Sequence, residues 1–153
     1  MKPNIGINKK DLKKSSVTLA SVLSNEMTLY VKTRKAHWNV TGESFMELHK
    51  LFEGQYKQTE EVIDEVAERI GKLGEKTIGT MNEFSKLTTI KEHPAKYGSS
   101  KEILKELLND HETIIIQLRK DIEKDPDAGT VDFLTGLMEQ HETTAWILRR
   151  YLN

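Results

Sequence analysis

Cysteine is absent from this sequence of 153 residues, which excludes disulfide bonds, thiolate metal sites and cysteine nucleophiles. No apolar run approaches the roughly 18 residues that a membrane-spanning helix needs. The N-terminus also lacks the apolar block of a signal peptide. Neither sign of charge is in large excess: the formal net charge is -1, which argues against a protein that mainly coats nucleic acid. We therefore expect a soluble, cytoplasmic protein that folds as one domain around a buried core.

The small net charge hides an asymmetry along the chain. Residues 1–14 carry a charge of +4 (five lysines against one aspartate), so the remainder carries -5. We expect residues 1–10 to form a flexible, lysine-rich tail and residues 11–153 to form the folded domain.

Apolar side chains recur every three or four residues along most of the chain, which is the spacing of an amphipathic α-helix. This pattern predicts four long helices, at about residues 11–38, 45–72, 100–124 and 131–152. The apolar stripe of the first helix includes Trp38, and that of the last includes Trp146. No pattern typical of β-strands competes with this interpretation.

Three capping boxes support these boundaries. In a capping box, a hydroxyl and a carboxylate three residues later satisfy backbone N–H groups that have no partner within the helix. The pairs that fit are Ser44 with Glu47, Thr80 with Glu83, and Ser99 with Glu102. The first and third pairs begin long helices, and the second predicts a short helix inside the connection between residues 72 and 100.

The lengths of the connections indicate the fold. Tight turns join the first helix to the second and the third to the fourth, whereas more than twenty residues separate the second from the third. A crossover along the length of a bundle explains a connection of that size. We therefore predict an all-α fold: the ferritin-like four-helix bundle, with one long crossover carrying a short extra helix.

Two histidines flank the first tight turn. His37 and His49 are both six positions from Glu43, so antiparallel helices place them at the same level. Glu53 lies one helical turn after His49 on the same face. Two imidazoles and one carboxylate have the character of a metal site. The alternative is that the histidines only join the two helices by hydrogen bonds, and the spacing leaves both interpretations open.

A carboxylate pair, Asp64 and Glu68, lies further along the second helix. It is about 22 Å from His49 at 1.5 Å per residue, so the two groups cannot share an ion within one chain. However, residues 49 and 64 differ in direction by only about 60° around the helix axis. A second copy packed antiparallel about a two-fold axis would bring His49 beside the partner subunit's carboxylates. The alternative is an ordinary solvated pair of acidic residues.

The remaining histidines do not form the usual di-iron pattern of bundles, Glu-x-x-His on two helices. Leu108 and Met138 stand three residues before His111 and His141, respectively. We interpret these two histidines as ordinary polar or interface residues, and His93, in the crossover, as a solvated loop residue. An iron site inside one subunit is therefore disfavoured.

The segment from His37 to Phe52, HWNVTGESFMELHKLF, and the following segment DEVAER at residues 64–69 together resemble the signature of the Dps family (DNA-binding proteins from starved cells), the mini-ferritins. This resemblance covers essentially the whole chain. It implies a hollow, spherical dodecamer built from two-fold dimers, with a ferroxidase centre at each dimer interface. Iron(II) would be oxidised there, with hydrogen peroxide favoured over dioxygen, and iron(III) would be stored as a mineral.

The resemblance also implies the residues of the site. The iron ligands correspond to His37, His49 and Glu53 of one subunit and to Asp64 and Glu68 of its partner. Many family members have aspartate at the position of Glu53, so this ligand departs from the usual pattern. Iron enters such shells through acidic pores near the start of the last helix, for which the candidates are Asp121, Asp127 and Asp132.

Some family members bind DNA through lysine-rich N-terminal tails. Many copies of a +4 tail in one shell would attach to phosphates in a salt-dependent way that does not depend on sequence. Three classes of function therefore remain: an iron-oxidising storage enzyme that protects DNA, a non-specific DNA-binding nucleoid protein with secondary metal binding, and a structural bundle without chemistry.

Overall fold

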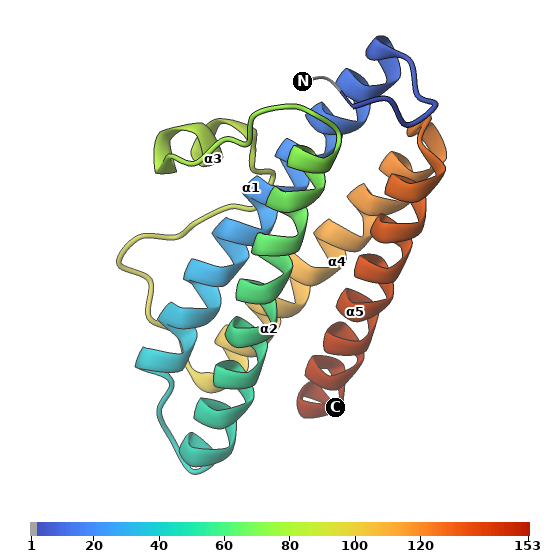
Figure 1. The fold of residues 1–153 in the computed structure, drawn as a ribbon. Helices are drawn as coiled ribbons and strands as arrows, with labels where there is room; N and C mark the ends of the chain where they lie inside the picture. Colours follow the sequence, from blue (N-terminus) through green and yellow to red (C-terminus); the bar gives the residue numbers. More distant parts are fainter. Residues whose placement is uncertain (1–2) are drawn as a thin grey trace.

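The structure, a computed structural model, describes residues 3–153 and contains no strand among them. Its helices are α1 (Lys9–Asn39), α2 (Phe45–Lys72), α3 (Met81–Leu87), α4 (Ser100–Lys124) and α5 (Ala128–Leu152). The four long helices run side by side, and the crossover that carries α3 follows the outside of the bundle (Figure 1). The predicted all-α bundle with one long crossover is therefore confirmed. None of the helices in residues 3–153 is long and apolar enough to cross a membrane.

The helix boundaries agree with the periodicity, with two differences at N-terminal ends. The side chain of Asn8 accepts a hydrogen bond from the backbone N–H of Asp11 at 3.0 Å, so α1 begins at Lys9 rather than at residue 11. Asp127 caps α5, which therefore begins three residues earlier than predicted. Lys2 lies outside the described residues, and the flexibility of the N-terminal segment stays a prediction.

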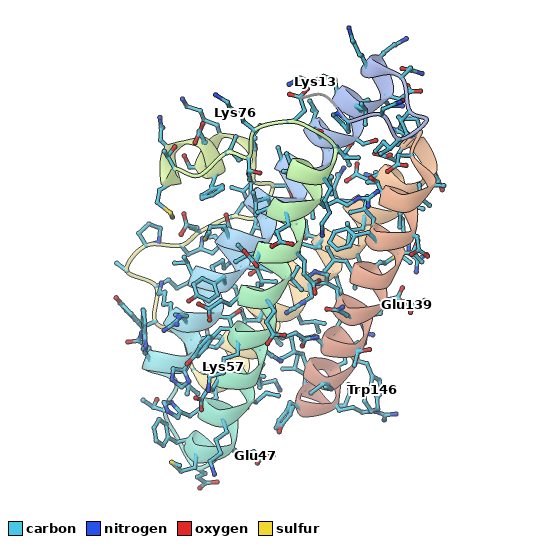
Figure 2. All side chains as sticks on the ribbon, in the orientation of Figure 1. Lys13, Glu47, Lys57, Lys76, Glu139 and Trp146 are labelled. Atoms are coloured by element: carbon cyan, nitrogen blue, oxygen red, sulfur yellow. The ribbon has the colours of Figure 1, made fainter. Side chains whose placement is uncertain are left out.

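Two of the three predicted capping boxes are present, and one is wrong. Thr80 with Glu83 and Ser99 with Glu102 form both reciprocal hydrogen bonds. Ser44 precedes α2 but makes no capping hydrogen bond through its side chain. The carboxylate of Glu47 instead accepts a hydrogen bond from the Tyr151 hydroxyl at 2.6 Å, because the end of α5 reaches this end of the bundle, where Figure 2 labels Glu47.

The core consists mainly of aliphatic side chains from all four long helices, and Phe52 is its largest fully buried side chain. The prediction that Trp38 continues the buried stripe of α1 is wrong, because its side chain is 64% exposed. His37 takes the inward position at this level, and the next residue points about 100° further round the helix. Trp146 is also exposed, on the side of α5 that faces away from the bundle in Figure 2.

Candidate metal centre

The imidazoles of His37, near the end of α1, and His49, near the start of α2, stack on each other. Their ring centroids are 3.7 Å apart and their planes differ by 21°. The α1–α2 turn contains Gly42 at φ 108°, a conformation that glycine adopts without steric cost. The expected placement of the two histidines at one level is therefore confirmed.

Two reciprocal hydrogen bonds fix the pair. Nδ1 of His37 lies 2.8 Å from the backbone oxygen of His49, and Nδ1 of His49 lies 3.0 Å from the backbone oxygen of His37. A carbonyl oxygen can only accept, so each Nδ1 must carry the proton. In the neutral imidazoles each Nε2 is then an unprotonated lone pair, which is the form in which histidine binds a metal. The helix-joining role and the ligand role are thus compatible in the same residues.

Aromatic side chains hold the pair on both sides. The ring of Tyr56 meets that of His37 edge-on at 5.2 Å between centroids, and Phe45 lies 5.1 Å from His49. The Arg34 guanidinium lies 4.2 Å from the centroid of Tyr56 and brings a positive charge next to the cluster. Arg34 also donates to the Tyr30 hydroxyl at 2.8 Å. Arg34 is not among the site residues predicted from the sequence, although the spacing of residues 30 and 34 is that of side chains on one helix face.

Glu53 is a carboxylate that lies near this pair within the chain. Its Oε1 lies 2.6 Å from Nζ of Lys57, which follows it by one helical turn. The hydrogen bond and the charge of Lys57 lower the pKa of Glu53, and His37 and His49 contribute weakly in the same direction. Lys57 is also not among the predicted site residues, although its position four residues after Glu53 predicts an ion pair on one helix face. The carboxylate is thus ionised and able to bind a cation that displaces the lysine.

Asp64 and Glu68 are exposed on α2 and do not join the histidines within the chain. The carboxylate of Glu68 is 3.4 Å from the Lys72 amine, with both side chains largely in solvent. Among the side chains of residues 3–153, no group of three or more histidines and carboxylates lies close enough to hold a metal ion. The fold therefore brings three of the five expected ligands to one end of the bundle and leaves two further along α2.

The three pore candidates differ in the exposure and in the hydrogen-bond partners of their carboxylates. Asp132 is exposed near the start of α5. Asp121 accepts a hydrogen bond from the Gln117 amide, and burial raises its pKa. Asp127 is buried and ion-paired with Arg69 at 2.6 Å; burial raises its pKa, but hydrogen bonds from Thr130 and Arg69 outweigh this and lower it. Asp127 thus has a structural role as the α5 cap, and a pore role for the three aspartates stays a prediction.

The other histidines divide between surface and interior. His93 is exposed in the crossover, as expected. His111 and His141 lie inside the bundle, 4% and 5% exposed, and are hydrogen-bonded to each other. The interpretation of these two as ordinary polar or interface residues is therefore wrong, because they face each other from α4 and α5 across the bundle interior.

Two of the N-terminal lysines are engaged with the body of the bundle. The Lys13 amine, at the end of the bundle labelled in Figure 2, lies 3.1 Å from the carboxylate of Glu75. The Lys14 amine donates to the backbone oxygen of Lys124. Since Lys9 and Lys10 belong to α1, the described lysines lie on a helix rather than in a free tail.

Comparisons with known proteins identify the family and the fold. The ferritin-like domain family matches residues 18–153. An uncharacterized low temperature-induced protein from Nostoc sp. is 41% identical over 98% of this chain and 87% of its own length. DNA protection during starvation protein 2 from Bacillus anthracis is 36% identical over 82% of this chain and 87% of its own length.

Solved structures show the same fold. DpsC from Streptomyces coelicolor superposes with a TM-score of 0.94 at 27% identity, covering 100% of this chain and 91% of that one. The DPS protein from Vibrio cholerae O1, described as a member of a broad superfamily of ferritin-like diiron-carboxylate proteins, gives a TM-score of 0.92 at 28% identity, covering 99% and 97%.

Proposed function

This chain belongs to the Dps family of ferritin-like proteins, and we propose that it oxidises iron(II) at centres shared between two subunits and stores the iron(III) product. The observation that carries the proposal is the stacked pair of His37 and His49. Both Nδ1 atoms donate to backbone oxygens, so both Nε2 atoms offer lone pairs beside the ionised carboxylate of Glu53.

The donor set suits iron as a substrate. Imidazole nitrogens bind iron(II) well, and carboxylate oxygens stabilise the harder iron(III) product. With hydrogen peroxide as oxidant, two iron(II) ions each give one electron, the O–O bond breaks, and two protons complete two molecules of water. Because the electrons are delivered as a pair, no hydroxyl radical is released. Consumption of both reagents would protect DNA, in keeping with the name of the Bacillus anthracis relative.

The centre needs a second copy of the chain. Asp64 follows His49 by 15 positions on one uninterrupted helix, a distance of about 22 Å. An antiparallel α2 from a partner, related by a two-fold axis, would set the partner subunit's Asp64 and the partner subunit's Glu68 beside His37, His49 and Glu53. The exposure of both carboxylates in the single chain supports their use at such an interface. A closed shell of such dimers, a dodecamer in the cytoplasm, completes the proposal.

Direct attachment to DNA through the N-terminal lysines is less well supported. Lys13 and Lys14 already contact Glu75 and the end of α4, which leaves fewer free amines for phosphates. A gel-shift assay with the full chain and with a chain lacking residues 1–10, at low and moderate salt, tests this alternative. A salt-sensitive shift that disappears with the truncation would establish it.

The first experiment mixes iron(II) with peroxide and follows the absorbance of iron(III). We expect His37→Ala with His49→Ala to slow oxidation by more than the roughly 10–100-fold that loss of a second-shell partner costs a metal site. The matched control is His93→Ala, which removes an exposed histidine of the crossover that is not among the proposed ligands and should oxidise iron at the parent rate. Unchanged kinetics in the double variant, with assembly intact, would disprove the site assignment.

A complementation experiment tests whether the centre is shared. One chain carries His37→Ala and His49→Ala, and the other carries Asp64→Ala and Glu68→Ala; each alone should be inactive. In a mixed dimer, one of the two centres receives histidines from one chain and carboxylates from the other, both unaltered. After unfolding and random co-assembly we expect about a quarter of the parent activity to return, since half of the dimers are mixed and each has one intact centre. A site within one chain would give no recovery.

A further inference from the structure

A second pair of histidines, far from the candidate metal centre in the sequence, forms a hydrogen-bonded chain inside the bundle. Nδ1 of His111 on α4 lies 2.9 Å from Nδ1 of His141 on α5, and Nε2 of His141 lies 2.9 Å from Oε1 of Glu26 on α1. All three side chains are buried, and Glu26 is only 1% exposed. The three groups therefore lie in series, because His141 uses one ring nitrogen for His111 and the other for Glu26.

A Glu26 carboxylate at one end would dictate the position of the protons along the whole chain. A carboxylate only accepts, so Nε2 of His141 must carry a proton. If His141 is neutral, its Nδ1 is then a lone pair, and Nδ1 of His111 must donate to it. Nε2 of His111 is then unprotonated, so its lone pair is a hydrogen-bond acceptor that lacks a donor.

That lone pair faces a small polar cavity. The cavity has a volume of about 20 Å³ and lies between the four long helices, lined by Glu26, Gln55, Gln58, Thr59, Val62, His111, Leu137, Gln140, His141 and Thr144. Nε2 of His111 and both amide atoms of Gln55 are buried without a hydrogen-bond partner among the described residues. Leaving such groups unpaired costs about 1–3 kcal/mol each, so the site calls for a small hydrogen-bonding ligand.

We propose that this cavity binds a single water molecule, held between Nε2 of His111 and the amide of Gln55, and that water, His111, His141 and Glu26 together form a relay that accepts a proton into the bundle interior. The volume is sufficient for a water, which needs roughly 10–15 Å³ and two or more polar partners. Three of the long helices, α1, α4 and α5, contribute one side chain each to the relay, and α2 contributes Gln55, which would hold the water.

The transfer balances without any other reactant. A proton arriving through the water binds Nε2 of His111, and the proton on Nδ1 of His111 moves to Nδ1 of His141. His141 becomes an imidazolium that is ion-paired with the Glu26 carboxylate, and His111 remains neutral with its proton on the other nitrogen. The added charge thus ends next to the buried carboxylate, where it is compensated.

The surroundings of the cavity favour this end point. The titratable groups that line it are Glu26 from α1, His111 from α4 and His141 from α5, while α2 contributes only uncharged side chains. Burial, with His141 adding to it, lowers the pKa of His111 well below its ordinary value. A metal ion is disfavoured, because Glu26 is the only anionic residue in the lining and already accepts from His141.

The ring nitrogens of the histidines test the tautomers directly. Protein with ¹⁵N-labelled histidine, assigned with His111→Gln and His141→Gln, is measured by NMR at neutral pH. We expect His111 to carry its proton on Nδ1 and His141 on Nε2. A proton on Nε2 of His111 at neutral pH would overturn the proposal. Glu26→Gln is the informative variant, because an amide can donate or accept and no longer imposes this order.

Acidification in steps, within the range where the assembly stays intact, tests the relay itself. We expect His141 to become doubly protonated while the proton of His111 switches from Nδ1 to Nε2. Direct conversion of His111 to an imidazolium, or two neutral rings until unfolding, would overturn the proton-accepting role. Gln55→Leu serves as the matched control: it removes a partner of the water but should leave the neutral-pH tautomers unchanged, since Glu26 sets them from the other end.

A crystal structure at atomic resolution tests the ligand. We expect one water within hydrogen-bond distance of His111 Nε2 and the Gln55 amide, about 2.7–3.2 Å from each. An empty cavity, or an ion at the roughly 2.0–2.1 Å typical of a metal–imidazole bond, would overturn the water site. Because none of these residues belongs to the proposed iron centre, failure here leaves the proposed function untouched.

Discussion

The molecule contains two histidine pairs whose imidazoles have different partners. At the end of the bundle, His37 and His49 each donate from Nδ1 to a backbone oxygen of the other residue. In the interior, His111 is hydrogen-bonded to His141, and His141 is in turn hydrogen-bonded to Glu26. The first pair presents two Nε2 lone pairs at the end of the bundle, whereas the second presents one lone pair to a small, half-open pocket between the helices.

The difference shows that the hydrogen-bond partner of one ring nitrogen determines whether the other ring nitrogen carries a proton. A backbone oxygen cannot change its protonation, so the end pair is held in a single tautomer that suits a metal ligand. A carboxylate and a second imidazole can exchange protons, so the interior pair has two arrangements of nearly the same heavy-atom geometry. Under the two proposals, the same residue type would bind a cation in one place and transfer a proton in the other.

The largest effect is expected from removing the charge that orders the interior pair. Glu26→Ala should lower the free energy of unfolding by about 3 kcal/mol, because the buried imidazole of His141 loses its acceptor. The matched control is Glu47→Ala, which removes an exposed carboxylate bonded to Tyr151 and should cost about 1 kcal/mol or less. Chemical denaturation gives both values, and equal losses would contradict the special role of Glu26.

The two pairs should respond oppositely to loss of a ring. His49→Ala should slow iron(II) oxidation by about 10–100-fold or more while changing stability little, since this ring lies at the margin of the bundle. His141→Ala should cost about 1–3 kcal/mol of stability and leave oxidation at the parent rate. Stopped-flow absorbance and denaturation on the same samples separate the effects. A loss of oxidation in folded His141→Ala would break the distinction between the pairs.

The interior pair should make the free energy of unfolding depend on pH. The folded pKa of His111 is lowered, so below the unfolded value of 6.5 the unfolded chain binds more protons than the folded one. Stability should therefore fall as the pH drops from about 6.5, by up to about 1.4 kcal/mol per pH unit for this one proton. Denaturation at a series of pH values should give a shallower slope for His111→Gln than for the parent chain.

The carboxyl group of Asp110 changes the dependence of stability on pH in the opposite direction to His111. Its contribution therefore has to be removed by a control variant. Burial raises the pKa of Asp110 to about 6, despite its ion pair with Lys32 at 2.6 Å. Between the ordinary value of 3.8 and about 6 the folded state binds the extra proton, so this group favours the folded state as the pH falls. Measuring His111→Gln in an Asp110→Asn background isolates the histidine. An unchanged slope in that background would contradict the buried, uncharged His111.

The smallest effect is expected at the end pair, from the lysine that shields its carboxylate. Lys57→Met should raise the affinity for iron(II) by roughly two- to fivefold, because Glu53 loses an exposed ion-pair partner with which the metal competes. Lys50→Met, at an exposed lysine on the same helix, is the matched control and should have no effect. Equilibrium binding of iron(II) without oxidant measures both, and a weaker affinity in Lys57→Met would show that the lysine supports the site.

The sequence predicted most of the architecture because helical periodicity and capping are local properties. The boundaries of α2 and α4 follow from the apolar spacing, and the level placement of His37 and His49 follows from counting through a tight turn. The errors arose where a distant partner competed. Glu47 bonds to Tyr151 from the other end of the chain instead of capping α2, and Trp38 points outward because a histidine takes the inward position.

The sequence by itself determined the all-α bundle, its crossover and the family, since these depend on residue types at fixed spacings along one chain. Only the tertiary structure decided what each histidine does. The tautomer of an imidazole depends on atoms that the fold brings from another helix, such as the His49 carbonyl for His37 and the Glu26 carboxylate for His141. A hydrogen bond between side chains 115 positions apart produces no periodic pattern in the sequence. The hydrogen bonds that link His111, His141 and Glu26 could therefore be identified only from the packed helices.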